Sequence, residues 1–346
     1  MNSTEHIGWF ADIGLADRAS VGGKAGSLGE LTRAAIAVPP GFVVRTKAFH
    51  HVVEALEREA PVRSLVEALN ADDLGGITAV SNTLKMRVQN APLPRAVERE
   101  ILGAHGALCG DAPVAVRSSA TTEDAEDASF AGLQDTYLWV MGAEAVLHHV
   151  RACWASLYSV TSIAYRRKHG LPEDGVAMAV VVQKMVDART SGVMFTRSPL
   201  TGDKSVITVE GAWGLGSSVV GGEVTPDRFV IGKITGDIST RDISDKHIEH
   251  RPAKAGGVCE LSVDNARRKL PCLSDDELQR LREIGRRIER HYGRPQDIEW
   301  AIDQSGAILI LQSRPETVWS AKERKPVAKP KDDPLHHVMT IFGGRR

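Results

Sequence analysis

The chain has 346 residues, of which 42% are hydrophobic and 25% are charged, and its formal net charge is −1 at pH 7. A chain of this length more often holds two lobes than one, and its near-neutral charge provides no long-range field for nucleic acid or for an anionic membrane. We therefore expect no nucleic-acid partner and no membrane partner, and any affinity for phosphate has to be local.

The N-terminal sequence and the cysteines indicate a cytoplasmic protein with reduced thiols. The first residues, MNSTEHIGWFADIG, lack the basic and apolar regions of a signal peptide. The longest apolar run, over residues 176–182, is too short to span a bilayer. The cysteines, Cys109, Cys153, Cys259 and Cys272, show no C-x-x-C spacing, which argues against a disulfide framework and against a zinc site.

A lysine in a glycine-rich segment is the first candidate ligand contact along the chain. The segment Val21–Leu31 reads VGGKAGSLGEL, with Lys24 between small residues. A glycine-rich turn lets a ligand approach the backbone, and the start of the following helix favours anions. The spacing is not that of a P-loop, and an exposed lysine in a glycine-rich connector is the alternative interpretation.

The next segments are predicted to be scaffold. Residues 42–44 form a predicted strand, and Thr46 is predicted to cap a helix that runs to about Glu59. Residues 60–110 are predicted to be helical and contain no evident chemistry.

The stretch from Pro113 to Val140 is predicted to be a strand, a long loop rich in hydroxyls and acids, and a second strand. Arg117 leaves the first strand directly into this loop. A guanidinium at a strand end makes bidentate, charge-assisted contacts to phosphate, and hydroxyls and backbone N–H groups add to them. The alternative is a surface salt bridge between Arg117 and the acids that follow it.

A long helix is predicted over residues 143–169, and the unbroken apolar run at 176–182 predicts a buried strand. That strand places Gln183 and Met185 at its end. Backbone groups at a strand terminus, together with a side-chain amide that is both donor and acceptor, suit the edge of a purine base. An ordinary surface glutamine is the alternative.

The last informative segment is a hairpin predicted over Asp297–Arg314. With a four-residue turn at 303–306, residue 302 pairs with residue 307, and Glu299 shares one face with Ile310, Gln312 and Arg314. The opposite face is then uniformly apolar and comprises Ile298, Trp300, Ile302, Leu309 and Leu311. A carboxylate and an amide oxygen fit a hard cation such as Mg²⁺. The alternative is a solvated Glu–Arg pair, and a turn one residue different would break the shared face.

Five stretches resemble the family of phosphoenolpyruvate synthase, pyruvate phosphate dikinase and rifampicin phosphotransferase. In chain order they are VGGKAGSLGEL, VPPGFVV, VAVRSSATTEDAEDASFAGLQDTYLWV, AWGLGSSVVGGEVTPDRFV and DIEWAIDQSGAILILQSRP. The resemblance implies an α+β fold of the ATP-grasp type, in which two lobes clamp Mg-ATP. The first lobe is expected over residues 1–185 and the second over 186–320, with 321–346 as a linker and candidate docking tail.

The resemblance also implies roles for individual residues. Lys24, Arg117 and Arg314 would act on the phosphates, Gln183 and Met185 would lie beside the adenine, and Glu299 and Gln312 would ligate Mg²⁺. The full set of implied nucleotide contacts is Lys24, Arg117, Gly132, Thr136, Gln183, Met185, Glu299, Gln312 and Arg314. The chain departs from the family at Ser217-Ser218, where an acidic residue often follows the GLG motif.

The activity implied by the resemblance is phosphoryl transfer from ATP to a histidine, which yields AMP and phosphate. Full-length members continue into a phosphohistidine domain with a T-S-H-type motif, and none of the twelve histidines here stands in that context. We therefore expect no phosphohistidine domain, and a histidine-bearing phosphotransfer subunit in trans. Phenylphosphate synthase is divided in this way, so phenol is the expected small-molecule acceptor. The alternatives are a split phosphoenolpyruvate synthase, a component of an antibiotic phosphotransferase, and a non-catalytic ATP-binding regulatory subunit.

Overall fold

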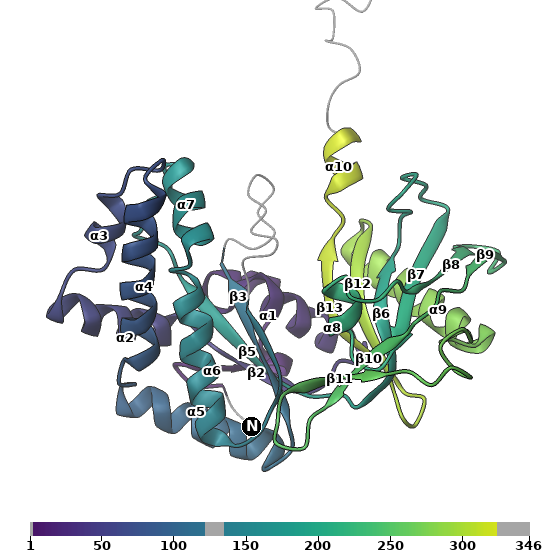
Figure 1. Cartoon of the computed structure of the whole chain (residues 1–346), viewed down its shortest axis with the longest axis horizontal. Coiled ribbons are helices and arrows are strands. Elements are labelled where there is room, and N and C mark those ends of the chain that lie inside the picture. Colours follow the sequence, from purple (N-terminus) through teal and green to yellow (C-terminus); the bar gives the residue numbers. More distant parts are fainter. Residues whose placement is uncertain (1–2, 122–134, 324–346) are drawn as a thin grey trace, which may run out of the picture.

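The computed structural model describes residues 3–121 and 135–323, which form two lobes, each built on an antiparallel sheet (Figure 1). The first sheet has the strand order β1-β2-β5-β3-β4, and the second has the order β13-β12-β6-β7-β8-β9. The chain leaves the first sheet at Lys184 and enters the second at Ala188. The predicted lobe boundary at residues 185/186 lies in this connection.

The strands are β1 Ile7–Trp9, β2 Gly41–Val44, β3 Val114–Ala120, β4 Thr136–Val140, β5 Met178–Lys184, β6 Ala188–Phe195, β7 Val206–Trp213, β8 Asp227–Gly232, β9 Ile238–Asp242, β10 Ile248–Pro252, β11 Val258–Ser262, β12 Gln296–Asp303 and β13 Ile308–Pro315. The α-helices are α1 Arg18–Arg33, α2 Thr46–Glu59, α3 Arg63–Glu67, α4 Leu74–Asn90, α5 Arg95–Cys109, α6 Ala143–Ser156, α7 Val160–Lys168, α8 Ser217–Val220, α9 Asp275–Tyr292 and α10 Val318–Glu323.

The first sheet is covered on both faces, which explains the unbroken apolar runs of its central strands. Val180 and Val182 of β5 face a core formed with α2, α4, α5 and α6, whereas Val181 faces a smaller core formed with α1. The helices of the larger core gather on one side of the sheet in Figure 1. The buried strand predicted from residues 176–182 is therefore confirmed, with its bounds moved to 178–184.

Two helix predictions need correction. The single helix predicted over residues 143–169 is two helices, α6 and α7, because the side chain of Ser159 accepts a hydrogen bond from the backbone N–H of Ser162 and starts a new helix. Thr46 is the first residue of α2 rather than its cap, since Arg45 holds the N-cap position.

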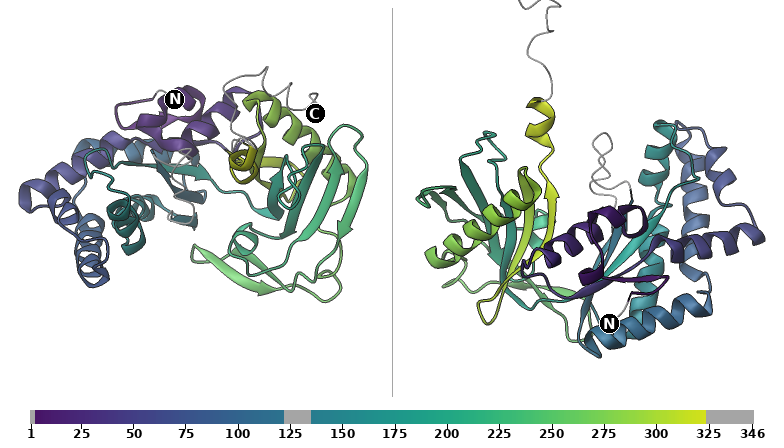
Figure 2. Two further views of the ribbon diagram at one scale, coloured as in Figure 1. Left: turned by 90° about the horizontal axis from the view of Figure 1, so that it is seen from above. Right: turned by 180° about the vertical axis from the view of Figure 1, so that it is seen from behind.

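The second sheet packs one face against α9, as the view from behind in Figure 2 shows. Ser274 and Glu277 form a capping box at the start of this helix. Leu278, Leu281 and Ile288 lie on its buried face, against Trp300 and other apolar residues of the sheet. The opposite face of the sheet is turned toward the first lobe. Within the described ranges, no helix is both long and apolar enough to cross a membrane.

The glycine-rich segment of α1 contains a kink at Gly22, where φ is +76° and ψ is 172°. A Cβ atom at this position would lie 2.2 Å from the backbone oxygen of Ser119 in β3. Only glycine tolerates both this backbone conformation and this contact. The kink lets the helix that follows it approach β3 closely and places Lys24 against that strand.

Replacing Gly22 by alanine is expected to lower the free energy of unfolding by about 2 kcal/mol or more, because strain at a positive φ adds to a steric clash. Gly106→Ala in α5 is the matched control, since nothing lies within 4 Å of a Cβ atom there. This control should stabilise the chain by about 0.5–1 kcal/mol. Urea denaturation followed by circular dichroism measures both, and equal stability of the two variants would contradict the steric argument.

Candidate functional site

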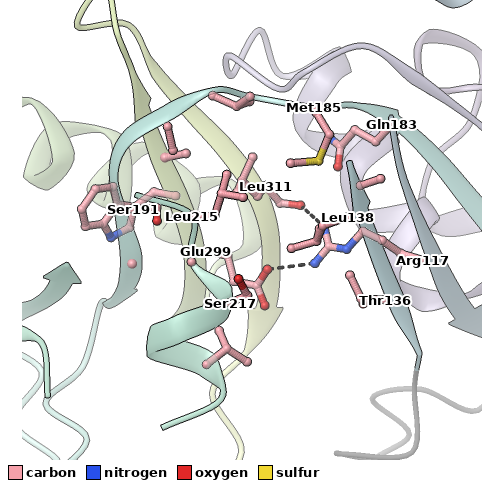
Figure 3. A pocket seen from close by; sticks show the side chains of 18 of the residues that line it. Arg117, Thr136, Leu138, Gln183, Met185, Ser191, Leu215, Ser217, Glu299 and Leu311 are labelled. Carbon is pink, nitrogen blue, oxygen red and sulfur yellow. Dashed lines mark hydrogen bonds and ion pairs between the residues drawn. The ribbon is translucent and has the colours of Figure 1, made fainter. Parts of the chain in front are cut away.

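Arg117 joins the two lobes at the centre of a pocket (Figure 3). Its Nη2 donates to Glu299 Oε2 and to Gln312 Oε1, each at 2.8 Å, and its Nη1 donates to the backbone oxygen of Leu311 at 2.8 Å. Arg117 belongs to β3 in the first lobe, whereas the three acceptors belong to β12 and β13 in the second. The Arg117 residue is 8% exposed, so these charge-assisted contacts are largely shielded from water.

The register of the β12–β13 hairpin brings Glu299 and Gln312 together. The two residues lie directly opposite each other across the ladder, and Ile302 pairs with Ile308. Between these pairs the register shifts by one residue next to Glu299, which marks a β-bulge. The bulge allows both polar side chains to face the first lobe.

The sequence-based account of this hairpin was wrong in two respects. The turn is one residue longer than predicted, because residue 302 pairs with residue 308 rather than with residue 307. As a result Ile310 lies in the core with Trp300, while Leu309 and Leu311 face the other way and pack against a small cluster that includes Val186 and Leu215. Gln312 still shares a site with Glu299 because the bulge offsets the longer turn.

The pocket has a volume of about 260 Å³ and is lined by both lobes. Gln183, Met185 and Thr136 line it, together with Arg117 and Glu299. Figure 3 shows Gln183 and Met185 grouped on one side and Glu299 facing Arg117. The pocket thus combines an apolar part with a charged part.

Two residues near the pocket have side chains with fixed hydrogen-bond partners. Gln183 is buried and its Nε2 donates to the backbone oxygen of Pro39 at 3.2 Å, so the amide is held by the segment just before β2. At the start of β4, burial and the neighbouring Asp135 carboxylate raise the pKa of Tyr137. Its phenol therefore keeps its proton and donates to Asp135 Oδ2 at 2.9 Å, beside Thr136.

Of the predicted site residues that the structure describes, Lys24, Gln312 and Arg314 do not line this pocket, and Gln312 is connected to it by its hydrogen bond with Arg117. Lys24 is buried, and its Nζ donates to the backbone oxygen of Ser118, the neighbour of Arg117 in β3, at 2.8 Å. The side chain of Arg314 is 48% exposed and its Nε lies 3.6 Å from Asp297 Oδ2. Gly132 lies outside the described residues.

Sequence reasoning missed several residues of the pocket. Leu311 was assigned to the core by the wrong register, although it lines the pocket and its carbonyl holds Arg117. Leu215 and Ser217 of the GLGS segment also line the pocket, as does Leu138 of β4. The GLG motif was the available signal, because a glycine-rich segment after a strand allows close approach to a ligand.

The donor set of Glu299 and Gln312 fits a hard divalent cation. Their two oxygens converge on one positively charged group, the Arg117 guanidinium, and carboxylate and amide oxygens are the ligands that Mg²⁺ accepts. A second group with metal-ligating side chains, Glu223, His250 and Glu260, is less suited. The two ring nitrogens of His250 already lie 2.7 Å from Ser217 Oγ and 2.9 Å from Glu223 Oε2, so hydrogen bonds alone explain that arrangement.

Comparisons with known proteins identify relatives over most of the chain. The family described as pyruvate phosphate dikinase, AMP/ATP-binding domain, matches residues 18–334. A probable phosphoenolpyruvate synthase from Staphylothermus marinus is 38% identical over 94% of this chain and 43% of its own length. Another from Methanothermobacter thermautotrophicus is 42% identical over 90% of this chain and 46% of its own length.

A rifampicin phosphotransferase from a Streptomyces species is 40% identical over 96% of this chain and 38% of its own length. The chain therefore spans less than half the length of each of these three relatives. With the two-lobed α+β architecture described above, the family match confirms the ATP-grasp fold expected from the sequence.

Proposed function

Because the chain belongs to the family of pyruvate phosphate dikinase AMP/ATP-binding domains, we propose that it binds Mg-ATP in the pocket between its two lobes and presents the nucleotide for phosphoryl transfer. The observation that carries this proposal is the convergence of Arg117, Glu299 and Gln312 from opposite lobes on one point. Cationic and anionic side chains gathered at one end of an otherwise apolar pocket suit a ligand with a flat apolar base and a charged metal-bound tail.

Each part of the pocket has a role in this proposal. Gln183 and Met185 contact the adenine, Glu299 and Gln312 hold the metal, and Arg117 contacts the phosphates. The Nε of Arg117 is buried and has no hydrogen-bond partner within the described ranges, which leaves it as a donor for a phosphate oxygen. When bound, Mg²⁺ would neutralise phosphate charge. The protein side chains supply positioning and further charge stabilisation.

Lys24 and Arg314 act at the edge of this pocket in the proposal. Lys24 lies against β3, where its Nζ donates to the carbonyl of Ser118, the neighbour of Arg117, and in the proposal a rotation of this side chain brings Nζ to a phosphate. Arg314 stands two residues beyond Gln312 in β13 and retains an exposed guanidinium. Both would require the nucleotide to extend beyond the present limits of the pocket.

The acceptor in the proposal is a histidine on a partner subunit, and the final acceptor is a small molecule, with phenol as the first choice. Net transfer consumes ATP and water and leaves AMP, inorganic phosphate and phosphohistidine. The Arg117–Glu299–Gln312 cluster supports catalysis over a purely regulatory ATP site, because binding alone would not need charges from both lobes at the phosphates. A phosphoenolpyruvate synthase or antibiotic phosphotransferase component is the second candidate, supported by the relatives named above.

The test is to incubate the purified chain with Mg²⁺ and ATP labelled in the β-phosphate, together with phenol, pyruvate or rifampicin. Calorimetry should show one ATP bound per chain, and no labelled organic phosphate should form. Addition of a histidine-bearing protein encoded beside this chain should produce labelled product with one of the acceptors. Labelled product from the chain alone would contradict the requirement for a partner, and absence of ATP binding would contradict the whole proposal.

A further inference from the structure

The guanidinium of Arg117 stands where the proposed metal ligands would hold a cation. Nη2 is 2.8 Å from Glu299 Oε2 and 2.8 Å from Gln312 Oε1. We infer that Arg117 occupies the oxygens of Glu299 and Gln312 until a nucleoside triphosphate binds. The pocket therefore accepts a divalent metal only as part of a metal–nucleotide complex. This inference rests on the proposed function and makes Arg117 a specificity-determining residue.

Electrostatics oppose the entry of free metal. A divalent ion approaching Glu299 and Gln312 meets a fixed positive charge at hydrogen-bond distance from both oxygens. The side chain of Arg117 is 10% exposed, so water screens this repulsion poorly. A free ion would also have to lose part of its hydration shell, which Mg²⁺ does reluctantly. In the nucleotide-free chain the arginine therefore competes successfully with the metal.

A triphosphate reverses this competition because it offers the guanidinium another anion. The Nε of Arg117 is a buried donor without a partner among the described residues, and Nε together with Nη2 matches the two-pronged geometry of a phosphate group. The Nη2 of Arg117 can therefore exchange both Glu299 and Gln312 for a phosphate while Nη1 stays on the Leu311 carbonyl. The freed carboxylate and amide oxygens would then hold the metal that accompanies the phosphates.

The exchange also opens the pocket. Its volume of about 260 Å³ lies at or below the small end of the range of about 300–1,000 Å³ typical of ligand sites. Arg117 and Glu299 face each other across the pocket, so breaking their contact frees the space between the two side chains. The lobes themselves remain joined, because Arg117 Nη1 stays on the Leu311 carbonyl, Ser27 Oγ of α1 donates to the Ser313 carbonyl at 2.7 Å, and the Ile310 N–H donates to the Ala37 carbonyl at 2.8 Å.

The test measures Mn²⁺ binding by electron paramagnetic resonance without any nucleotide. Wild-type chain should show no Mn²⁺ at this site, whereas Arg117→Met, which keeps most of the side-chain bulk, should gain one site. The dissociation constant of that site for Mn²⁺ should be about tenfold to a hundredfold lower than that of any wild-type binding at Glu299 and Gln312. A difference of this size corresponds to the free energy of one charge-assisted hydrogen bond. It should disappear in Arg117→Met/Glu299→Gln. Arg241→Met is the control, since Arg241 pairs with Asp275 on the surface.

Wild-type chain that binds Mn²⁺ as tightly as Arg117→Met would overturn the inference, as would a folded Arg117→Met without a new site. If circular dichroism shows that Arg117→Met does not fold, Arg117→Gln replaces it, because glutamine removes the charge but keeps an N–H donor. A gain in Mn²⁺ affinity is again expected, and no gain in the folded variant would overturn the inference. The Mn²⁺ measurement uses no nucleotide, so its outcome does not depend on ATP binding. A failure of ATP binding would contradict the proposed function, whereas a failure of the Mn²⁺ prediction would contradict this inference.

Discussion

Replacing both Glu299 and Gln312 by alanine is expected to remove the dependence of ATP affinity on Mg²⁺. In the presence of Mg²⁺ the dissociation constant for ATP should rise by about a hundredfold, because two charge-assisted contacts of about 1.5–3 kcal/mol are lost and part of that loss is offset by Arg117. In EDTA the affinity of the variant for free ATP should equal or exceed that of wild type. The reason is that Arg117 no longer has to leave Glu299 and Gln312 before it contacts phosphate.

Isothermal titration calorimetry with and without Mg²⁺ checks both halves of this expectation. Gln304→Ala is the matched control, since Gln304 lies in the turn of the same hairpin, exposed and outside the pocket. This control should retain the wild-type response to Mg²⁺. If the double variant responds to Mg²⁺ as strongly as wild type, Glu299 and Gln312 do not hold the metal.

The largest expected effect on stability comes from Asp227, the first residue of β8. Its Oδ1 accepts hydrogen bonds from Lys246 Nζ at 2.5 Å and from the Ser244 N–H at 2.9 Å, and its Oδ2 accepts one from the Cys272 N–H at 2.8 Å. Both members of the Asp227–Lys246 ion pair are completely buried. Asp227→Ala leaves the ammonium buried and unpaired, so we expect the free energy of unfolding to fall by about 3–5 kcal/mol.

Urea denaturation at pH 7 measures this effect. The control is Arg241→Ala, which breaks the exposed pair between Arg241 and Asp275 and should cost about 1 kcal/mol or less. A loss in Asp227→Ala no larger than in this control would show that water reaches Lys246 after the substitution. The buried pair would then contribute no more to stability than a surface pair does.

The secondary structure around the site was largely predictable because local patterns dominate there. The short run of β-branched and other apolar residues before Gln183 favours a strand covered on both faces, and the structure has one there. Ser274 and Glu277 carry a capping box, whose hydrogen bonds form within one helical turn. In contrast, the break between α6 and α7 at Ser159 was missed, since the apolar pattern continues across it and a single serine is a weak signal.

The pairing of strands across the site was less predictable. The bulge next to Glu299 and the turn longer by one residue shift the strand register in opposite directions. Neither feature has a distinctive sequence here. Their combined effect kept Gln312 beside Glu299 but moved Leu311 from the predicted core into the pocket. One-residue shifts of this kind depend on packing against β6 and α9, which no local window contains.

The sequence by itself determined the family and the two-lobed α+β fold, because five motifs in a set order are a property of the chain. It also singled out Arg117, Glu299 and Gln312 as charged or polar groups at strand positions. Only the tertiary structure decided that these three meet, since Arg117 and Gln312 are separated by 195 positions and belong to different sheets. It likewise decided that Arg117 contacts the proposed metal ligands directly, because electrostatic pairing depends on distance in space rather than along the chain.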